Sequence, residues 1–263
     1  MTASTRPIEA LTFDFGNTLV PVSRGALASV VRATADAAAS RLGPFEADAF
    51  LSIWSEERER QFREDVPEFR EVDIGQRGAR VLARLRGAAA PAGDERWDDP
   101  TTAASSTPEE IEWLIETYSA AFLDRIPPPP AIRPMLERLA VGRILAILSN
   151  WPHAATIDRY ADGAGWSPYL RAVVVSQRVG TIKPQRAIFD LAQELLGVSP
   201  DAILHVGDDW DADVVGATRA GWRAAYVRGR PDDSPLPSSA RDAHVQPAFE
   251  LDRVTDLEQA LDP

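Results

Sequence analysis

Short, uninterrupted runs of apolar and β-branched residues recur near the start of the chain and through its second half. Such runs do not alternate with polar residues, which is typical of strands buried on both faces of a parallel sheet. Helical patterns separate the last four runs, so this half consists of repeated strand–helix units. The pattern therefore predicts an α/β fold with a doubly wound parallel sheet. The expected strands are residues 9–15, 143–148, 172–175, 202–206 and 224–227.

Two helices and a terminal segment complete this predicted sheet domain. A helix over 184–196 would open with Pro184, which suits a first-turn position. A second helix is expected over 212–220, and the chain should end with a short strand near Val245 and a helix that finishes at Leu261.

The stretch 22–126 lacks strand patterns and carries amphipathic helical spacing instead. It lies between the first two strands, where a simple βαβ unit needs only roughly 30 residues in all. Thr107, Pro108 and Glu110 form a helix-start signal, whereas 87–106 is expected to be a mobile loop. The sequence thus predicts an all-helical inserted domain over 22–126, and a core domain formed by 1–21 and 127–263.

The composition and charge of the chain disfavour some classes of binding partner. The 263 residues carry a formal net charge of -12, which disfavours nucleic acid and anionic membranes. A small-molecule substrate is expected. There is no cysteine, and we find neither a signal-peptide pattern nor a membrane-spanning apolar run, so a cytoplasmic location is expected. The pattern does not indicate an oligomeric state.

Polar segments follow four of the expected strands. They are Asp14 to Thr18, Ser149 with Asn150, Thr181 to Pro184, and Gly207 to Asp209 with Asp213 beyond it. Each alone has an ordinary explanation as a turn or a helix cap. Open α/β sheets bind their ligands at the carboxyl ends of the strands, however, so the four together indicate one site.

The order of these segments, with the phrases Gly-Thr-Ile-Lys-Pro and His-Val-Gly-Asp-Asp-Trp-Asp-Ala-Asp-Val-Val-Gly-Ala, resembles the haloacid dehalogenase (HAD) superfamily. The resemblance implies a Rossmann-like core, a helical cap of the C1 type that closes over the substrate, and an aspartate nucleophile. In most branches it also implies magnesium-dependent phosphoryl transfer on small phosphorylated metabolites.

The resemblance assigns roles to individual residues. Asp14 would be the nucleophile and, with Asp208 and the carbonyl of Gly16, a ligand of Mg²⁺, which prefers hard oxygen donors. Phosphoryl oxygens would be bound by Thr18, Ser149, the Asn150 amide and Lys183, the only lysine in the chain. Asp209 or Asp213 would orient Lys183 or water from the outer shell, and the spacing favours Asp213.

Gly16 departs from the pattern of the family's phosphatases, which usually have an aspartate here to protonate the leaving oxygen. General acid–base help of this kind contributes about 10² to 10⁴ in rate. Three explanations are open. The leaving group needs little protonation, as in an acyl phosphate or a glycosyl 1-phosphate; His153 replaces the acid, since its pKa suits the task; or the chain is a nearly inactive phosphate-binding relative.

A further alternative is hydrolysis of haloacids without a metal. The relatives that do so have an aromatic residue two places after the nucleophile, where this chain has Gly16. The retained Asp208 and Asp209 carboxylates also fit a metal site better than a metal-free one. Phosphate monoester hydrolysis is therefore the favoured prediction.

Overall fold

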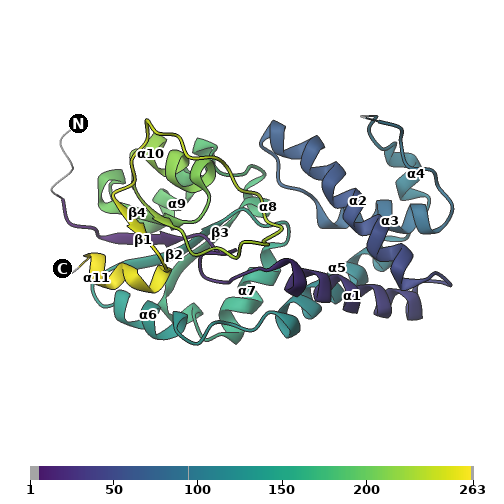
Figure 1. Cartoon of the computed structure of the whole chain (residues 1–263), viewed down its shortest axis with the longest axis horizontal. Helices are drawn as coiled ribbons and strands as arrows, with labels where there is room; N and C mark the ends of the chain where they lie inside the picture. The colour runs from purple at the N-terminus through teal and green to yellow at the C-terminus, as the bar shows by residue number, and fades with distance from the viewer. Residues whose placement is uncertain (1–5, 94, 262–263) are drawn as a thin grey trace. The chain divides into compact units, whose positions relative to one another are not determined.

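The computed structural model describes residues 6–93 and 95–261. They form two compact units (Figure 1). One contains the residues up to Arg24 together with those from Pro127 onward, and the other is Gly25–Ile126. The helical unit thus begins at Gly25, whereas the sequence led us to expect its start at residue 22. Among the described helices, none has the length and apolar character needed to cross a membrane.

The first unit is built on a six-stranded parallel sheet with the order β3-β2-β1-β4-β5-β6, so the predicted α/β class is confirmed. β1 lies at its centre, where Phe13 pairs with Ile147 on one side and Val206 on the other. The chain runs outward from β1 in both directions, which makes its carboxyl end the point where ligands bind in such sheets. The strands are β1 (Ala10–Phe13), β2 (Ile144–Ser149), β3 (Leu170–Val175), β4 (Ile203–Gly207), β5 (Arg223–Val227) and β6 (Phe249–Leu251).

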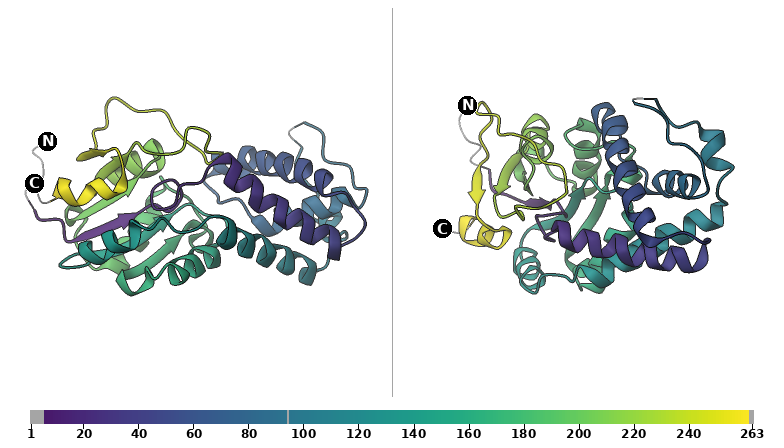
Figure 2. Two further views of the ribbon diagram at one scale, coloured as in Figure 1. Left: turned by 60° about the horizontal axis from the view of Figure 1, so that its bottom comes forward. Right: turned by 45° about the vertical axis from the view of Figure 1, so that its right-hand side comes forward.

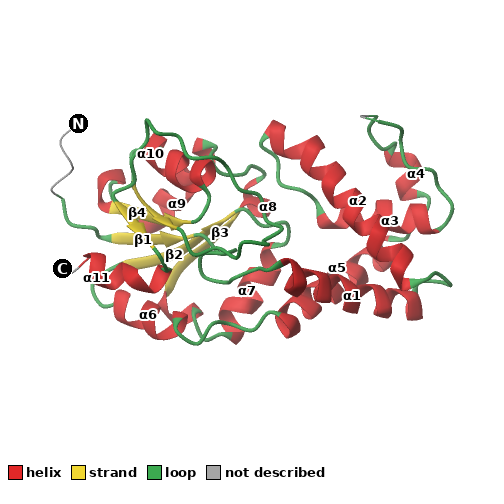
Figure 3. Ribbon diagram, in the orientation of Figure 1, coloured by secondary structure: helices red, strands yellow, loops and turns green. Residues whose placement is uncertain are grey.

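Helices cover both faces of this sheet. Figure 3 shows α9 and α10 on one face and α6 and α7 on the other, and the turned views of Figure 2 agree. The helices of this unit are α6 (Ile132–Leu139), α7 (Ala154–Gly163), α8 (Ser176–Val179), α9 (Arg186–Leu196), α10 (Gly216–Arg219) and α11 (Leu257–Leu261). A π-helical turn, Trp210–Val215, precedes α10, and 3₁₀ turns occupy Ser167–Tyr169, Pro200–Ala202 and Val254–Asp256.

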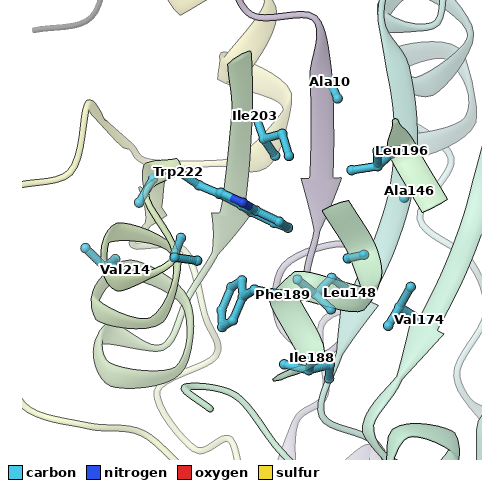
Figure 4. Packing of buried hydrophobic residues seen from close by; sticks show 14 of the residues in the cluster. Ala10, Ala146, Leu148, Val174, Ile188, Phe189, Leu196, Ile203, Val214 and Trp222 are labelled. Carbon is cyan, nitrogen blue, oxygen red and sulfur yellow. The ribbon is translucent and has the colours of Figure 1, made fainter. Parts of the chain in front are cut away.

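Buried apolar side chains fill the space between the sheet and α9 (Figure 4). The rings of Phe189 and Trp222 meet edge to face with centroids 5.2 Å apart. Leu148 of β2 and Ile203 of β4 pack into the same cluster. Burial of apolar area stabilises by about 25 cal/mol per Å², so these contacts hold β1, β2 and β4 firmly beside one another at the site.

Two predicted elements are placed differently by the structure. The helix expected from Pro184 begins at Arg186, because the backbone of Lys183 bonds to Asn150 and the segment serves the site instead. The short terminal strand expected near Val245 lies farther along the chain, as β6 (Phe249–Leu251). Val245 instead donates its N–H to the Asp242 carbonyl in a turn and packs against the core.

The second unit is all helical, as its pattern predicted. It contains α2 (Ala47–Asp65), α3 (Ile74–Leu85), α4 (Asp99–Ala103), α5 (Pro108–Arg125) and all but the first residue of α1 (Arg24–Arg41), with a 3₁₀ turn at Val66–Glu68. The stretch 87–106 is not a simple loop, because it includes α4. Buried Glu57 of α2 accepts hydrogen bonds from Arg84 at 3.0 Å and Trp97 at 2.9 Å, which ties α2 to α3 and to this segment.

Helix α5 starts with the predicted capping box. Thr107 Oγ1 accepts a hydrogen bond from the Glu110 amide at 3.3 Å, and Glu110 Oε2 accepts one from the Thr107 amide at 2.9 Å. Thr107→Ala should lower the free energy of unfolding by about 1 kcal/mol, as other lost caps do. Urea denaturation followed by circular dichroism measures this change.

The matched control is Thr117→Ala in the middle of α5. Its hydroxyl bonds only to the Trp113 carbonyl within the helix, and alanine has the higher helix propensity. This variant should be neutral or slightly stabilising, and equal losses in both variants would refute the capping role of Thr107.

Candidate active site

The loop after β1 returns sharply on itself at the edge of the sheet. The Asp14 amide still bonds to the Val206 carbonyl at 2.9 Å, so this residue is fixed by the pairing with β4. Asn17 then adopts a left-handed conformation with φ 60°, which asparagine tolerates better than most residues. The turn brings Thr18 back toward the carboxyl end of β4, where it meets Asp208.

Asp14 has one oxygen held and one available. Its Oδ1 accepts hydrogen bonds from Lys183 Nζ at 2.8 Å and from Ser149 Oγ at 3.0 Å. Within the described chain no hydrogen bond reaches Oδ2. The side chain is only 12% exposed, so the carboxylate is oriented by Oδ1 and presents Oδ2 for chemistry.

Lys183 is the cation at the centre of these contacts. Its Nζ also donates to Asp213 Oδ1 at 2.6 Å and to the Leu148 carbonyl at 2.9 Å, so all three protons are used. Burial lowers the pKa of Lys183, but the Asp14 and Asp213 carboxylates outweigh it and raise the pKa above its usual value. The Asn150 side chain accepts from the Lys183 amide at 2.7 Å and donates to its carbonyl at 3.1 Å, which fixes the position of the lysine backbone.

A polar chain supports Asp213 from inside the sheet. His205 Nε2 lies 3.0 Å from Asp213 Oδ1, and Nδ1 lies 2.8 Å from Thr12 Oγ1. Burial lowers the pKa of His205, so a neutral ring would donate from Nε2 and accept at Nδ1. Burial tends to raise the pKa of Asp213, but the effects of Lys183 and His205 are larger. The pKa therefore lies below its ordinary value, and the carboxylate stays ionised.

Asp208 receives a hydrogen bond on each oxygen. Thr18 Oγ1 donates to Oδ1 at 3.1 Å, and Arg230 Nη1 donates to Oδ2 at 3.2 Å. Burial, with repulsion from Asp14 and Asp213, raises the pKa of Asp208 to about 8. Burial likewise raises the pKa of Asp14 to about 6, although Lys183 and Ser149 act in the opposite direction. The cation beside each carboxylate, Lys183 for Asp14 and Arg230 for Asp208, therefore does not fully offset the cost of burying it.

The side chains of Asp209 and His153, the remaining predicted residues, make other contacts. Asp209 caps the following helical turn, since its Oδ1 accepts from the Ala212 amide at 2.8 Å. Of the two acids considered for the outer shell, Asp213 is the one that contacts Lys183. His153 is the N-cap residue of α7, and its Nδ1 lies 2.8 Å from Thr156 Oγ1.

Sequence reasoning missed Arg230 and gave His205 no function. Arg230 comes shortly after the carboxyl end of β5, so the rule that selected the other segments could have found it. His205 interrupts an otherwise apolar strand, and a polar side chain that is completely buried requires a partner. The sequence alone does not name that partner.

Three oxygen donors can hold a divalent cation here. They are the carboxylates of Asp14 and Asp208 and the Gly16 carbonyl, which accepts no hydrogen bond from the described chain. Among the described residues, no three His, Cys, Asp or Glu side chains are arranged to hold a metal. Hard oxygen donors suit Mg²⁺, and its charge would offset the excess of buried carboxylates.

Apolar side chains of Leu236 and Trp151 lie against Gly16. A Cβ atom built at this position would lie 2.6 Å from Leu236 Cδ1 and 3.3 Å from Trp151 Cζ3. The first distance is shorter than any normal carbon contact, so a larger residue would require Leu236 to move. The place where a second acid would begin is filled by apolar side chains.

Comparisons with known proteins identify the family of the chain. A family model described as haloacid dehalogenase-like hydrolase matches residues 8–221. The glyceraldehyde 3-phosphate phosphatase of Methanopyrus kandleri is 29% identical over 263 residues, which cover 95% of this chain and 95% of that protein.

Solved structures show the same fold over the full length. A 2-haloacid dehalogenase from Pseudomonas syringae pv. Tomato DC3000 has a TM-score of 0.68 at 24% identity, covering 97% of this chain and 98% of its own. The HAD-hydrolase YfnB from Bacillus subtilis, bound to magnesium, has a TM-score of 0.62 at 18% identity, covering 98% and 100%. The resemblance found in the motifs is confirmed by the family match, which spans β1 to β4, and this chain belongs to the haloacid dehalogenase-like hydrolases.

Proposed function

We propose that this hydrolase is a magnesium-dependent phosphate monoester hydrolase that acts on a small phosphorylated metabolite. The observation that carries the proposal is the state of Asp14, whose Oδ1 is held by Lys183 and Ser149 while Oδ2 is unbonded. The phosphatase relative that matches over nearly the whole chain supports the choice of substrate class.

The reaction would proceed in two displacements at Asp14. Oδ2 attacks phosphorus, the bond from phosphorus to the leaving oxygen breaks, and an aspartyl phosphate forms. Water then attacks this phosphorus, which releases phosphate and restores the carboxylate. When bound, Mg²⁺ would neutralise the charge of the nucleophile and the phosphoryl group as they approach.

The other residues of the site would orient the phosphoryl group and stabilise its negative charge. Lys183 holds a fixed positive charge beside the phosphoryl oxygens, and Asp213 with His205 fixes its ammonium group. Thr18 and Ser149 would turn their hydroxyls toward the phosphoryl oxygens, joined by the Asn150 amide. Asp14, Asp208 and the Gly16 carbonyl would hold the cation.

The direct test is turnover of para-nitrophenyl phosphate, whose leaving group needs little protonation. Activity should require Mg²⁺ and disappear with EDTA, and Asp14→Asn should lower kcat by at least about 10³-fold because the nucleophile is lost. Asp190→Asn is the control, since Asp190 only pairs with Arg186 on the surface at 2.7 Å.

Two results would contradict the proposal. If purified protein released no phosphate with Mg²⁺ and Asp14→Asn changed nothing, the chain would be a phosphate-binding relative without turnover. Metal-independent release of chloride from 2-chloropropionate would instead identify a haloacid dehalogenase, the class of several structural neighbours.

Of the three explanations for Gly16, we propose to test first the replacement of the missing acid by His153. His153→Ala should lower turnover of alkyl phosphates by about 10²-fold, the lower end of the usual contribution of a general acid. Turnover of aryl phosphates should change little, because their leaving groups depart without a proton. Equal losses for both classes of substrate would rule out proton donation by His153.

Magnesium binding should depend on pH through Asp14 and Asp208. In the folded protein their pKa values, about 6 and about 8, lie above the ordinary 3.8. Between the ordinary and the raised pKa values, the folded protein therefore binds more protons than the unfolded chain. The stability of the metal-free protein therefore falls as pH rises through this window. Mg²⁺ needs the ionised carboxylates, so it should raise the melting temperature more at pH 8.5 than at pH 6.

Asp208→Asn provides the comparison for this pH dependence. Its metal-free form should lose less stability between pH 6 and pH 8.5, because one repelling carboxylate is absent. Mg²⁺ should no longer stabilise it. Differential scanning fluorimetry measures both effects, and a Mg²⁺ effect that is the same at both pH values would contradict the proposed ligands.

A further inference from the structure

The segment after β5 lies directly on the proposed site. We name residues 230–239 the C-terminal strap. Asn17 Nδ2 donates to Ser234 Oγ at 3.0 Å, and Ser239 donates from its amide and its hydroxyl to the Asp209 carboxylate, each at 2.8 Å. The strap is thus fastened to the loops that follow β1 and β4.

Arg230 joins the strap to Asp208. Its Nη2 donates to the Leu236 carbonyl at 2.8 Å, and Nη1 donates to the Pro237 carbonyl and to Asp208 Oδ2, both at 3.2 Å. One guanidinium therefore closes the strap on itself and neutralises a buried carboxylate. The Arg230 side chain is only 19% exposed, so the contact belongs to the interior of the site.

The strap lies against two of the three proposed cation donors. Arg230 occupies one oxygen of Asp208, and the other accepts from Thr18. Leu236 rests on Gly16, whose carbonyl is a second donor. A divalent cation on Asp208 would repel the neighbouring guanidinium.

We propose that Arg230 is a further positioning residue of the site, which competes with the divalent cation for Asp208 and couples cation binding to release of the strap. This inference rests on the proposed function, because it takes Asp208 as a cation ligand. Coupling between two binding events is reciprocal. The cation therefore loosens the strap, and loosening the strap strengthens cation binding.

Titration calorimetry with MgCl₂ tests the first half of the coupling. Arg230→Gln should bind Mg²⁺ about tenfold more tightly than the wild type, within the usual range of coupled sites. Ser234→Ala, which removes the anchor on Asn17 and leaves Asp208 untouched, should give a smaller gain. That gain distinguishes release of the strap from a simple change of charge.

Arg228→Gln is the matched control for charge. It removes the same charge two positions earlier, from a side chain that pairs with Asp252 at 2.7 Å on the surface. Its affinity for Mg²⁺ should equal that of the wild type. A tenfold gain in this control as well would overturn the specific role of Arg230.

Hydrogen exchange of the wild type tests the second half without any substitution. Mg²⁺ should increase amide exchange across residues 232–239 while the strands stay protected. If the wild type binds Mg²⁺ but Arg230→Gln binds it no more tightly, or exchange in the strap is unchanged, the strap inference fails and the proposed function stands. If the wild type binds no Mg²⁺, both fail.

Discussion

The buried ammonium of Lys183, held between Asp14 and Asp213, is the interaction on which the rest of the site depends. Its side chain is 1% exposed and donates to both carboxylates and to the end of β2. A buried charge left without its partner costs about 3 to 5 kcal/mol, so these three groups stabilise one another. They also bring together the segments that follow β1, β3 and β4. In this arrangement Asp14 Oδ1 contacts the lysine and Oδ2 is left unbonded.

The buried carboxylates of the site outnumber the cations beside them, and this excess of negative charge has consequences for ligand binding. Asp14, Asp208 and Asp213 share two nearby cations, Lys183 and Arg230. Asp213 takes the strongest stabilisation, so the cost of burial appears in the raised pKa values of Asp14 and Asp208. An environment of this kind favours any added positive charge. Arg230 supplies part of it from within the chain, and a divalent cation would supply more.

The sequence predicted those features that arise from local patterns. The central strands β1, β2 and β4 were visible because they are buried along almost their whole length, and Asp14, Lys183 and Asp208 were visible because they follow strands that end at one edge. Contacts between distant segments left no such signal. Nothing near Pro184 indicates that Asn150 holds the Lys183 backbone and delays α9 until Arg186.

Gly16 and Leu236 are best understood as one feature. Leu236 of the strap occupies the space in which a side chain at position 16 would begin. Arg230 fastens the same strap to Asp208. An acid at position 16 would therefore require the end of the Leu236 side chain to move. Because Arg230 bonds both to the Leu236 carbonyl and to Asp208, the strap contacts the loop after β1 and the end of β4 through neighbouring groups.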